Sequence, residues 1–349
     1  MLLFSFLNGV QVIGVTQWAL TGRLIGWLVI LGYLSIGVLI NKYMGKLGVF
    51  RSIDTLISTA IVIIIFTTLM RWVAINGWFD PGPITLNFEG FSGNRNSFAF
   101  QLLCCSMLLM SYSRNPNGGK RINTFFISID KENFIAIANG FLLAGIVFTG
   151  SIAGFFTGII MIIGFTLGGF INTKLVVKSV IFCVILWILF EMVFVDSNIP
   201  FSTYKLVESI DGSSNTERWK TITLGFQMWR ESFWFGAGLG VFIEKSPQWF
   251  NKPVVIHSTP VWVLAEFGII GFTILASQIY WVVSTLYNRF PLKANHRTII
   301  ILITMISIFG MVHEMFYQRI FWLILGICLS ESRNNKVEIQ ETKIITDKV

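Results

Sequence analysis

Charged residues are scarce in this chain of 349 residues, since Asp, Glu, Lys and Arg make up 13% of it whereas 54% of it is hydrophobic. Soluble domains carry about 25% charged residues. This scarcity, with a mean hydropathy of +0.71, excludes a soluble globular fold and predicts an all-α, polytopic membrane protein. The net charge of +8 does not indicate a nucleic-acid partner, because the basic residues cluster between apolar runs, as in cytoplasmic loops.

Motifs for metal, disulfide and nucleophilic chemistry are also missing. Four cysteines lie within apolar runs without paired Cys/His spacing, so neither a zinc site nor a disulfide framework is predicted. They are Cys104, Cys105, Cys183 and Cys328. There is no acidic cluster for a metal, no nucleophile elbow and no pair of carboxylates that the sequence places together. We therefore expect neither a metal nor a cofactor.

Apolar runs of about 17 to 25 residues, the length that spans a membrane, or slightly fewer occur about ten times. They lie at 2–20, 24–40, 53–70, 97–112, 133–150, 152–171, 179–195, 260–285, 298–314 and 317–330. The first run contains Asn8 and lacks a basic n-region and a cleavage site, so a retained helix is expected rather than a cleaved signal. Ten spans place both termini on the same side of the membrane. Residues 1–349 are predicted to form a single integral membrane domain.

The basic residues of the short loops all fall on one side of these spans, which the positive-inside rule makes cytoplasmic. They are Lys42, Lys46, Arg51, Arg114, Lys120, Arg121, Lys131, Lys174, Lys178, Arg289, Lys293 and Arg297. The charged tail, residues 331–349, shares that side and is predicted to be solvated. Two larger loops, 71–96 and 196–257, are therefore predicted to be extracytoplasmic.

The longer loop has structure of its own. Residues 215–231 have helical spacing with caps and predict an amphipathic helix at the membrane surface. A glycine turn, Gly236–Gly240, follows. It lacks the βαβ context of a dinucleotide fingerprint, so no nucleotide site is predicted there. No internal repeat with paired broken helices occurs, which disfavours a secondary transporter.

A helix is predicted to begin after the long loop, with Thr259 as its N-cap and Pro260 as its first residue. His257 then lies just outside the positive end of that helix. An uninterrupted helical period places Glu266, Ile270, Thr273, Ser277, Tyr280 and Ser284 on one polar stripe. Gly268 and Gly271 fall opposite it, where small residues let a neighbouring helix approach.

Cations gather on the extracytoplasmic side, together with this histidine. They are Arg95, Arg218, Lys220 and Arg230. Arginine presents a fork of donors suited to phosphate, and a helix N-terminus also attracts anions. The combination suits a lipid-linked phosphate. It predicts a displacement in which His257 takes a proton from a hydroxyl while arginines stabilise the departing phosphate.

Structural roles remain open for the same residues. Arg95 could extend toward lipid headgroups, Arg218 could pair with Glu217 or Glu231, and Arg230 could be purely structural. His257 could be a hydrogen-bonded structural residue at the helix start. Structural hydrogen bonding is also the expected role of Glu191, His313 and Glu314, three polar residues at the ends of apolar runs.

One spacing ties these residues to a family. His257-Ser258, nine residues, Gly268, two residues and Gly271 match the pattern His-[Asn/Ser/Gln]-x9-Gly-x-x-Gly of the O-antigen ligase family of bacterial envelope proteins, which the chain resembles. Further similarity lies in Gly93–Ser97, in Glu217–Trp219 and in the segment 235–242, in the same order. Together these cover roughly residues 90 to 275.

The resemblance implies a metal-independent, inverting glycosyltransferase of the C type (GT-C), in the bacterial inner membrane. It would use a glycan on undecaprenyl diphosphate and an acceptor glycan, either lipid A-core or a growing polysaccharide, on the extracytoplasmic face. His257 would activate the acceptor hydroxyl, and Arg95 and Arg218 would hold the donor diphosphate. Apart from the resemblance, the candidates for lining or supporting the cavity are Arg230, Lys220, Glu266, Asn94 and Asn96. Membrane lipid is an expected partner, and a chain-length regulator is a possible one.

Three departures from the family pattern bear on the branch to which the chain belongs. Ser151-Ile152 stands where members often have Ser-Arg, no proline precedes the glycine turn in 231–236, and the chain shows ten spans rather than about twelve. The open functions are therefore a ligase, a repeat-unit polymerase or a protein O-oligosaccharyltransferase. A transporter of lipid-linked sugars and a non-catalytic envelope scaffold are the alternatives of another class.

Overall fold

The computed structural model describes residues 1–17, 23–78, 88–113, 121–123, 128–194, 214–287 and 294–329. The chain divides into two compact units, each of which is described by itself. The first unit comprises Met1–Ser35, Asp211–Pro291 and Ile303–Leu323, and the second comprises Ile36–Ile210, Leu292–Leu302 and Ile324–Val349. The predicted tail, 331–349, and the first part of the long loop, 196–213, lie outside the described residues.

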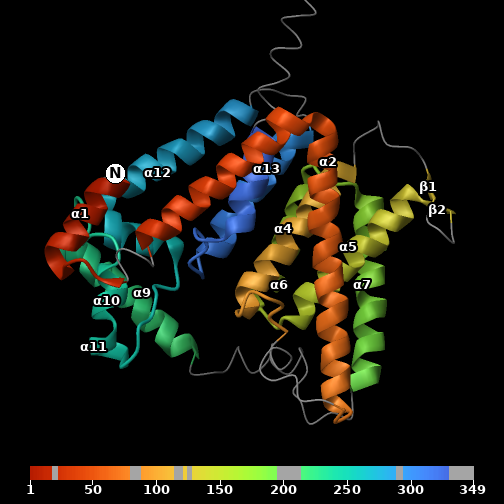
Figure 1. Cartoon of the computed structure of the whole chain (residues 1–349), viewed down its shortest axis with the longest axis horizontal. Coiled ribbons are helices and arrows are strands. Elements are labelled where there is room, and N and C mark those ends of the chain that lie inside the picture. Colours follow the sequence, from red (N-terminus) through yellow and green to blue (C-terminus); the bar gives the residue numbers. More distant parts are fainter. Residues whose placement is uncertain are drawn as a thin grey trace, which may run out of the picture. The chain divides into compact units, whose positions relative to one another are not determined.

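Helices make up nearly all of the described structure (Figure 1). The helices are α1 (Leu2–Ile13), α2 (Ile25–Ile75), α4 (Arg95–Ser113), α5 (Lys131–Phe148), α6 (Ile152–Leu167), α7 (Thr173–Phe194), α9 (Ser214–Glu231), α10 (Val241–Lys245), α11 (Pro247–Phe250), α12 (Thr259–Tyr287), α13 (Ala294–Gly310) and a last helix, Arg319–Leu329. Two short strands, β1 (Arg121–Asn123) and β2 (Ser128–Asp130), pair antiparallel, with Ile122 opposite Ile129. The all-α prediction missed this small sheet.

Within the described residues, five helical segments are long and apolar enough to cross a membrane. They are Ile25–Gly45, Arg51–Ala74, Lys131–Phe148, Thr173–Val193 and Thr259–Thr285. Four shorter apolar helices are Leu2–Ile13, Ile152–Leu167, His296–Gly310 and Arg319–Leu329. With α4, these helices coincide with the ten predicted apolar runs, although the number that cross a membrane stays a prediction.

The first predicted span, 2–20, does not form one continuous helix. Helix α1 has 12 residues and ends before Gly14, whose φ is 77°. Its length of about 18 Å is short of the roughly 30 Å of a bilayer core. The prediction that residues 2–20 form a single spanning helix is therefore wrong.

Within the second unit, α5 packs along both α4 and α7 (Figure 1). The side chains of α4 are buried from Phe98 to Leu108 except for the partly buried Gln101, so this helix shows no polar face. A buried hydrogen bond of 2.8 Å from Ser106 Oγ to Asn139 Oδ1 joins α4 to α5. Helix α7 instead exposes large hydrophobic side chains such as Ile188. These exposed side chains suit contact with lipid.

Within the first unit, α9 packs against α12, and α1, α10 and α11 gather with them (Figure 1). The core contains Trp262, Phe242, Phe267 and Met228, from α12, α10 and α9. Burial of these large side chains fixes α9 beside the start of α12. The segment that carries His257 connects the short helices to α12.

Candidate active site

Helix α9, Ser214–Glu231, confirms the predicted helix at 215–231 and shows the expected two faces. Thr221, Gly225 and Met228 are buried at helical spacing, whereas Trp219 and Arg230 are exposed. A Cβ on Gly225 would come within 2.9 Å of both Ile256 and Val261, so α9 lies close against the start of α12. Its location at a membrane surface stays a prediction.

His257 is held by its backbone to α9. The His257 amide donates a hydrogen bond to Thr221 Oγ1 at 3.4 Å, and that hydroxyl donates to the Arg218 carbonyl at 2.8 Å. The side chain of His257 is partly buried. Thr221 therefore links the histidine to the helix turn that carries Arg218.

Thr259 fixes the other side of this segment, but not as predicted. Its Oγ1 donates to the His313 carbonyl at 2.8 Å and accepts from the Met315 amide at 3.0 Å. The helix includes Thr259 itself. The prediction that Thr259 caps α12 is therefore wrong, because its hydroxyl binds the loop before the last helix instead.

The surroundings of His257 lower its pKa below the ordinary value of about 6.5. Burial is the largest cause, because it disfavours the charged imidazolium, and the positive charge of Arg218 acts in the same direction. Glu217 opposes this effect and Lys252 adds to it, while these two residues form an ion pair with Nζ and Oε1 3.1 Å apart. His257 is therefore neutral near pH 7, the state in which it can accept a proton.

A second histidine lies beside the first. The rings of His257 and His313 are nearly perpendicular, at 88°, with centroids 6.3 Å apart, and His313 is buried. A structural role for His313 was expected, but its position next to His257 was not. The sequence signal, a histidine within an apolar run, could not reveal a neighbour so far along the chain.

Helix α12 is interrupted at Gly268, which has φ 68° and ψ −173°. An uninterrupted stripe from Glu266 through Ile270 therefore does not exist. Glu266 is fully buried, whereas Ile270 is 38% exposed and Tyr280 is 75% exposed. The predicted polar stripe is wrong, because it extended one helical period across the kink.

The glycine turn crosses α12 at this kink and binds the backbone groups that the kink frees. The amides of Ala237 and Gly238 donate to the carbonyls of Ala265 and Glu266, at 2.8 and 3.2 Å. On the other side of the kink, the amides of residues 269 and 270 donate to the carbonyls of residues 233 and 234, at 3.0 and 3.2 Å. Unpaired backbone groups would be costly in such an apolar setting, so the turn completes the broken helix.

Two glycines make this crossing possible. A Cβ on Gly268 would lie 2.4 Å from the Trp234 oxygen, and one on Gly236 would lie 2.5 Å from the Phe267 nitrogen. Both have positive φ, 68° and 73°. The prediction that Gly268 allows close packing is right in kind, but its partner is a turn rather than a neighbouring helix.

Helix α1 covers the crossing. Ser5 Oγ donates to the Glu266 carbonyl at 2.8 Å, and Asn8 Nδ2 donates to the Gly236 carbonyl at 2.9 Å. A Cβ on Gly9 would meet the Leu239 oxygen at 2.6 Å. These contacts account for the polar Asn8 in an apolar run.

Glu266 belongs to a buried cluster around Arg23. The Arg23 guanidinium pairs with the Glu314 carboxylate and interacts electrostatically with Glu266. It also lies 5.3 Å from the Trp262 ring centroid and 5.2 Å from that of Tyr317. One buried cation therefore faces two carboxylates, which explains how Glu266 is tolerated there. Arg23 was not among the site residues predicted from the sequence.

The other two predicted cations of α9, Lys220 and Arg230, have surroundings different from those of Arg218. Lys220 Nζ donates to the Trp249 carbonyl at 3.1 Å and lies 4.9 Å from the Phe250 ring centroid, so it anchors α11. Arg230 is exposed in the last turn of α9. Of the predicted cations in the first unit, Arg218 is the one whose charge acts on His257.

The predicted residues Asn94, Arg95 and Asn96 belong to the second unit. Asn94 Oδ1 caps α4, accepting from the amides of residues 96 and 97 at 2.8 and 3.2 Å. Asn96 Oδ1 accepts from Ser151 Oγ at 2.7 Å, and that hydroxyl caps α6 by accepting from the Gly154 amide. The positive N-terminal ends of α4 and α6 thus meet beside Arg95, which favours binding of an anion.

Comparison with known proteins identifies one domain of the chain. Residues 137–276 match the family described as O-Antigen ligase, a segment that includes Arg218, the glycine turn, His257 and Gly268. No curated protein matches the chain. Among the described residues, no group of three His, Cys, Asp or Glu side chains could hold a metal ion. The chain thus carries an O-antigen ligase domain at residues 137–276, and it is a multi-pass membrane enzyme of the ligase or polymerase type.

Proposed function

We propose that the chain is a metal-independent, inverting glycosyltransferase of the C type. It transfers a glycan from undecaprenyl diphosphate to an acceptor hydroxyl on the extracytoplasmic face of the bacterial inner membrane. One observation carries the proposal: His257 has a lowered pKa and is held through Thr221 beside Arg218. A neutral base next to a cation is what a displacement with an anionic leaving group requires.

The reaction follows from these roles. His257 accepts the proton of the acceptor hydroxyl as its oxygen attacks the anomeric carbon. The bond from that carbon to the diphosphate oxygen breaks, and the diphosphate leaves with the electron pair, so the configuration inverts. Arg218 stabilises the growing negative charge. We propose a phosphate-binding role for Arg95 as well, because a cation at the N-terminal ends of two helices is best stabilised by an anion.

The test is His257→Ala, expressed in a strain that lacks the wild-type chain. The variant should insert normally and lose glycan transfer by about 10²- to 10⁴-fold, the contribution typical of a general base. Arg319→Gln, which changes an exposed cation on the same unit, is the control and should transfer normally. Normal transfer by His257→Ala would remove the catalytic assignment.

Lysine substitutions test whether the arginines bind phosphate through bidentate hydrogen bonds or act only through their positive charge. Arg218→Lys and Arg95→Lys should rescue poorly, because a point charge loses the bidentate geometry of the guanidinium. Arg319→Lys should be nearly fully active. Near-full activity of the first two variants would favour headgroup anchoring over a diphosphate site.

The surface polysaccharide of a deletion strain distinguishes the members of this enzyme class. Loss of all capped lipid, with polymer accumulating on the carrier, indicates a ligase. Lipid capped with a single repeat indicates a polymerase. A transporter would instead move lipid-linked sugar across vesicles that contain no acceptor glycan.

A further inference from the structure

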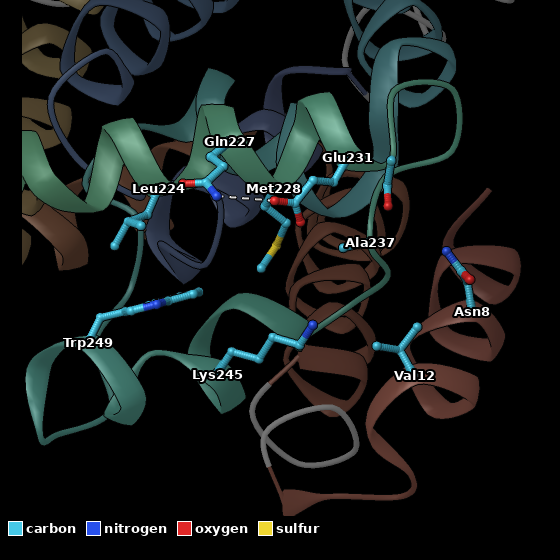
Figure 2. Close-up of a pocket in the computed structure, with 10 residues that line it drawn as sticks. Asn8, Val12, Leu224, Gln227, Met228, Glu231, Ala237, Lys245 and Trp249 are labelled. Carbon is cyan, nitrogen blue, oxygen red and sulfur yellow. Dashed lines mark hydrogen bonds between the residues drawn. The ribbon is translucent and has the colours of Figure 1, made fainter.

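A cavity of about 160 Å³ lies within the first unit, beside the glycine turn (Figure 2). Side chains of α9 form one wall, Lys245 of α10 and Trp249 of α11 form the facing wall, and α1 contributes Asn8. The mechanism proposed above uses none of these side chains. They combine polar groups with an aromatic ring and with the apolar Met228 of α9.

The polar groups are oriented and offer both donors and acceptors. Gln227 Nε2 donates to Glu231 Oε1 at 3.2 Å, so the other oxygens of this pair can accept from a ligand (Figure 2). Asn8 Nδ2 donates to the Gly236 carbonyl, so Asn8 Oδ1 is the group that can accept a hydrogen bond from a ligand. Lys245 supplies up to three N–H donors. Because Lys245 and Glu231 carry opposite charges, the lining of the cavity has little net charge.

Trp249 is held in place at the facing wall. Its ring packs against that of Phe242, with centroids 5.9 Å apart, and its carbonyl accepts from Lys220. Its half-buried indole therefore offers a fixed, apolar surface. A sugar ring has C–H groups on its faces and hydroxyls around its edge. An aromatic surface among mixed donors and acceptors matches both.

We infer that this cavity binds one sugar unit of the acceptor glycan, a conclusion that rests on the proposed function. Helix α9 gives the direction. Arg218 comes first along it, Thr221 then holds His257, and Gln227 follows about 9 Å further along the axis. In a displacement with inversion, the hydroxyl arrives opposite the departing diphosphate. The diphosphate therefore belongs at the Arg218 end of α9 and the acceptor at the Gln227 end.

The test measures binding by saturation-transfer NMR on the purified full-length protein. The probe is the mixture of water-soluble oligosaccharides that mild acid releases from the surface lipids of the producing cell. Wild type and His257→Ala should bind equally. Trp249→Ala and Gln227→Ala should weaken binding about tenfold or more, as for a central aromatic or polar contact.

Phe226→Ala is the matched control, because it removes an aromatic side chain from α9 that does not line the cavity, and it should bind as wild type does. Gln227 is exposed, so its variant tests the site even if Trp249→Ala folds poorly. Wild-type binding by Gln227→Ala and by folded Trp249→Ala would overturn the inference.

Steady-state kinetics test whether the bound sugar belongs to the acceptor or to the donor. Gln227→Ala should raise the KM for the acceptor and leave the KM for the donor unchanged. A rise in the donor KM alone would overturn the acceptor assignment. Activity of His257→Ala would refute the proposed function without changing the binding result, so the two failures are distinguishable.

Discussion

The two candidate site regions, around Arg95 and around His257, are built in different ways. At Arg95, the cap comes from the preceding residue, Asn94, and its Oδ1 binds amides within the next three residues. At His257, the support comes from Thr221, 36 residues away, and the helix that follows, α12, is broken at Gly268 and completed by the glycine turn. The helix cap beside Arg95 is set by local chain chemistry, and a single hydrogen bond, from Ser151 to Asn96, adds α6 to it. The region around His257 instead depends on several backbone contacts between segments that meet only in the folded chain.

This difference predicts unequal sensitivity to substitution. A lost helix cap can be replaced in part by water or by a shift of the first turn, at a cost of about 1 kcal/mol. The crossing at Gly268 and Gly236 has no such freedom, because backbone contacts backbone there. A single substitution at the crossing beyond His257 should therefore cause a large loss of stability, whereas a substitution at the helix cap beside Arg95 should cause a small one.

The largest effect is expected for Gly268→Ala. Its Cβ would lie 2.4 Å from the Trp234 oxygen, at a φ of 68° that L-residues rarely adopt. Positive φ alone costs about 1 to 2 kcal/mol, and the backbone clash adds to it. We expect a sharp loss of purified folded protein and of thermal stability.

Gly32→Ala is the control for that variant, since nothing lies within 4 Å of its added Cβ and the residue is in the helix α2. It should be neutral or stabilise by up to about 1 kcal/mol. Equal melting temperatures for the two variants would contradict the claim that the crossing of the glycine turn and α12 cannot accommodate a Cβ.

The next effect concerns the pH dependence of transfer. The base must be neutral, so activity is present above the lowered pKa of His257 and is lost as pH falls through it. Burial is the largest cause of the low pKa, and Arg218 lowers it further, so Arg218→Gln should move the acid limb to higher pH. Glu217→Gln removes an opposing charge and should move it to lower pH.

Each profile is compared as a fraction of its own maximum, because Arg218→Gln also weakens phosphate binding. The two shifts should shrink in high salt, which screens the partly exposed Glu217. Shifts in the same direction, or none, would show that the titrating group is not His257.

The smallest effect is expected for Asn94→Ala. It removes the cap of α4 and should destabilise the protein by about 1 kcal/mol. Asn94→Ser retains a capping oxygen and should restore most of that loss. Thermal unfolding of both variants is the measurement. A loss as large as that of Gly268→Ala would break the contrast between the two regions.

The positions of the helices were largely predictable, because a long apolar run has few other stable structures in a membrane. The helix at 215–231 was also predictable from its spacing. The kink at Gly268 was not, because a single glycine leaves the hydrophobic run intact. The stripe through Glu266 failed for that reason, and the assignment of Thr259 as a cap failed because its hydroxyl had a distant partner.

Composition and spacing by themselves determined the membrane class, the helical segments and the motif from His257 to Gly271 that marks the family. These properties are local, so they can be read along the chain. Only the tertiary structure decided that Arg218 lies beside His257, that Gly236 fits against Gly268 and that Arg23 pairs with Glu314. Contacts of this kind join residues far apart in sequence, and their geometry exists only once the helices have packed.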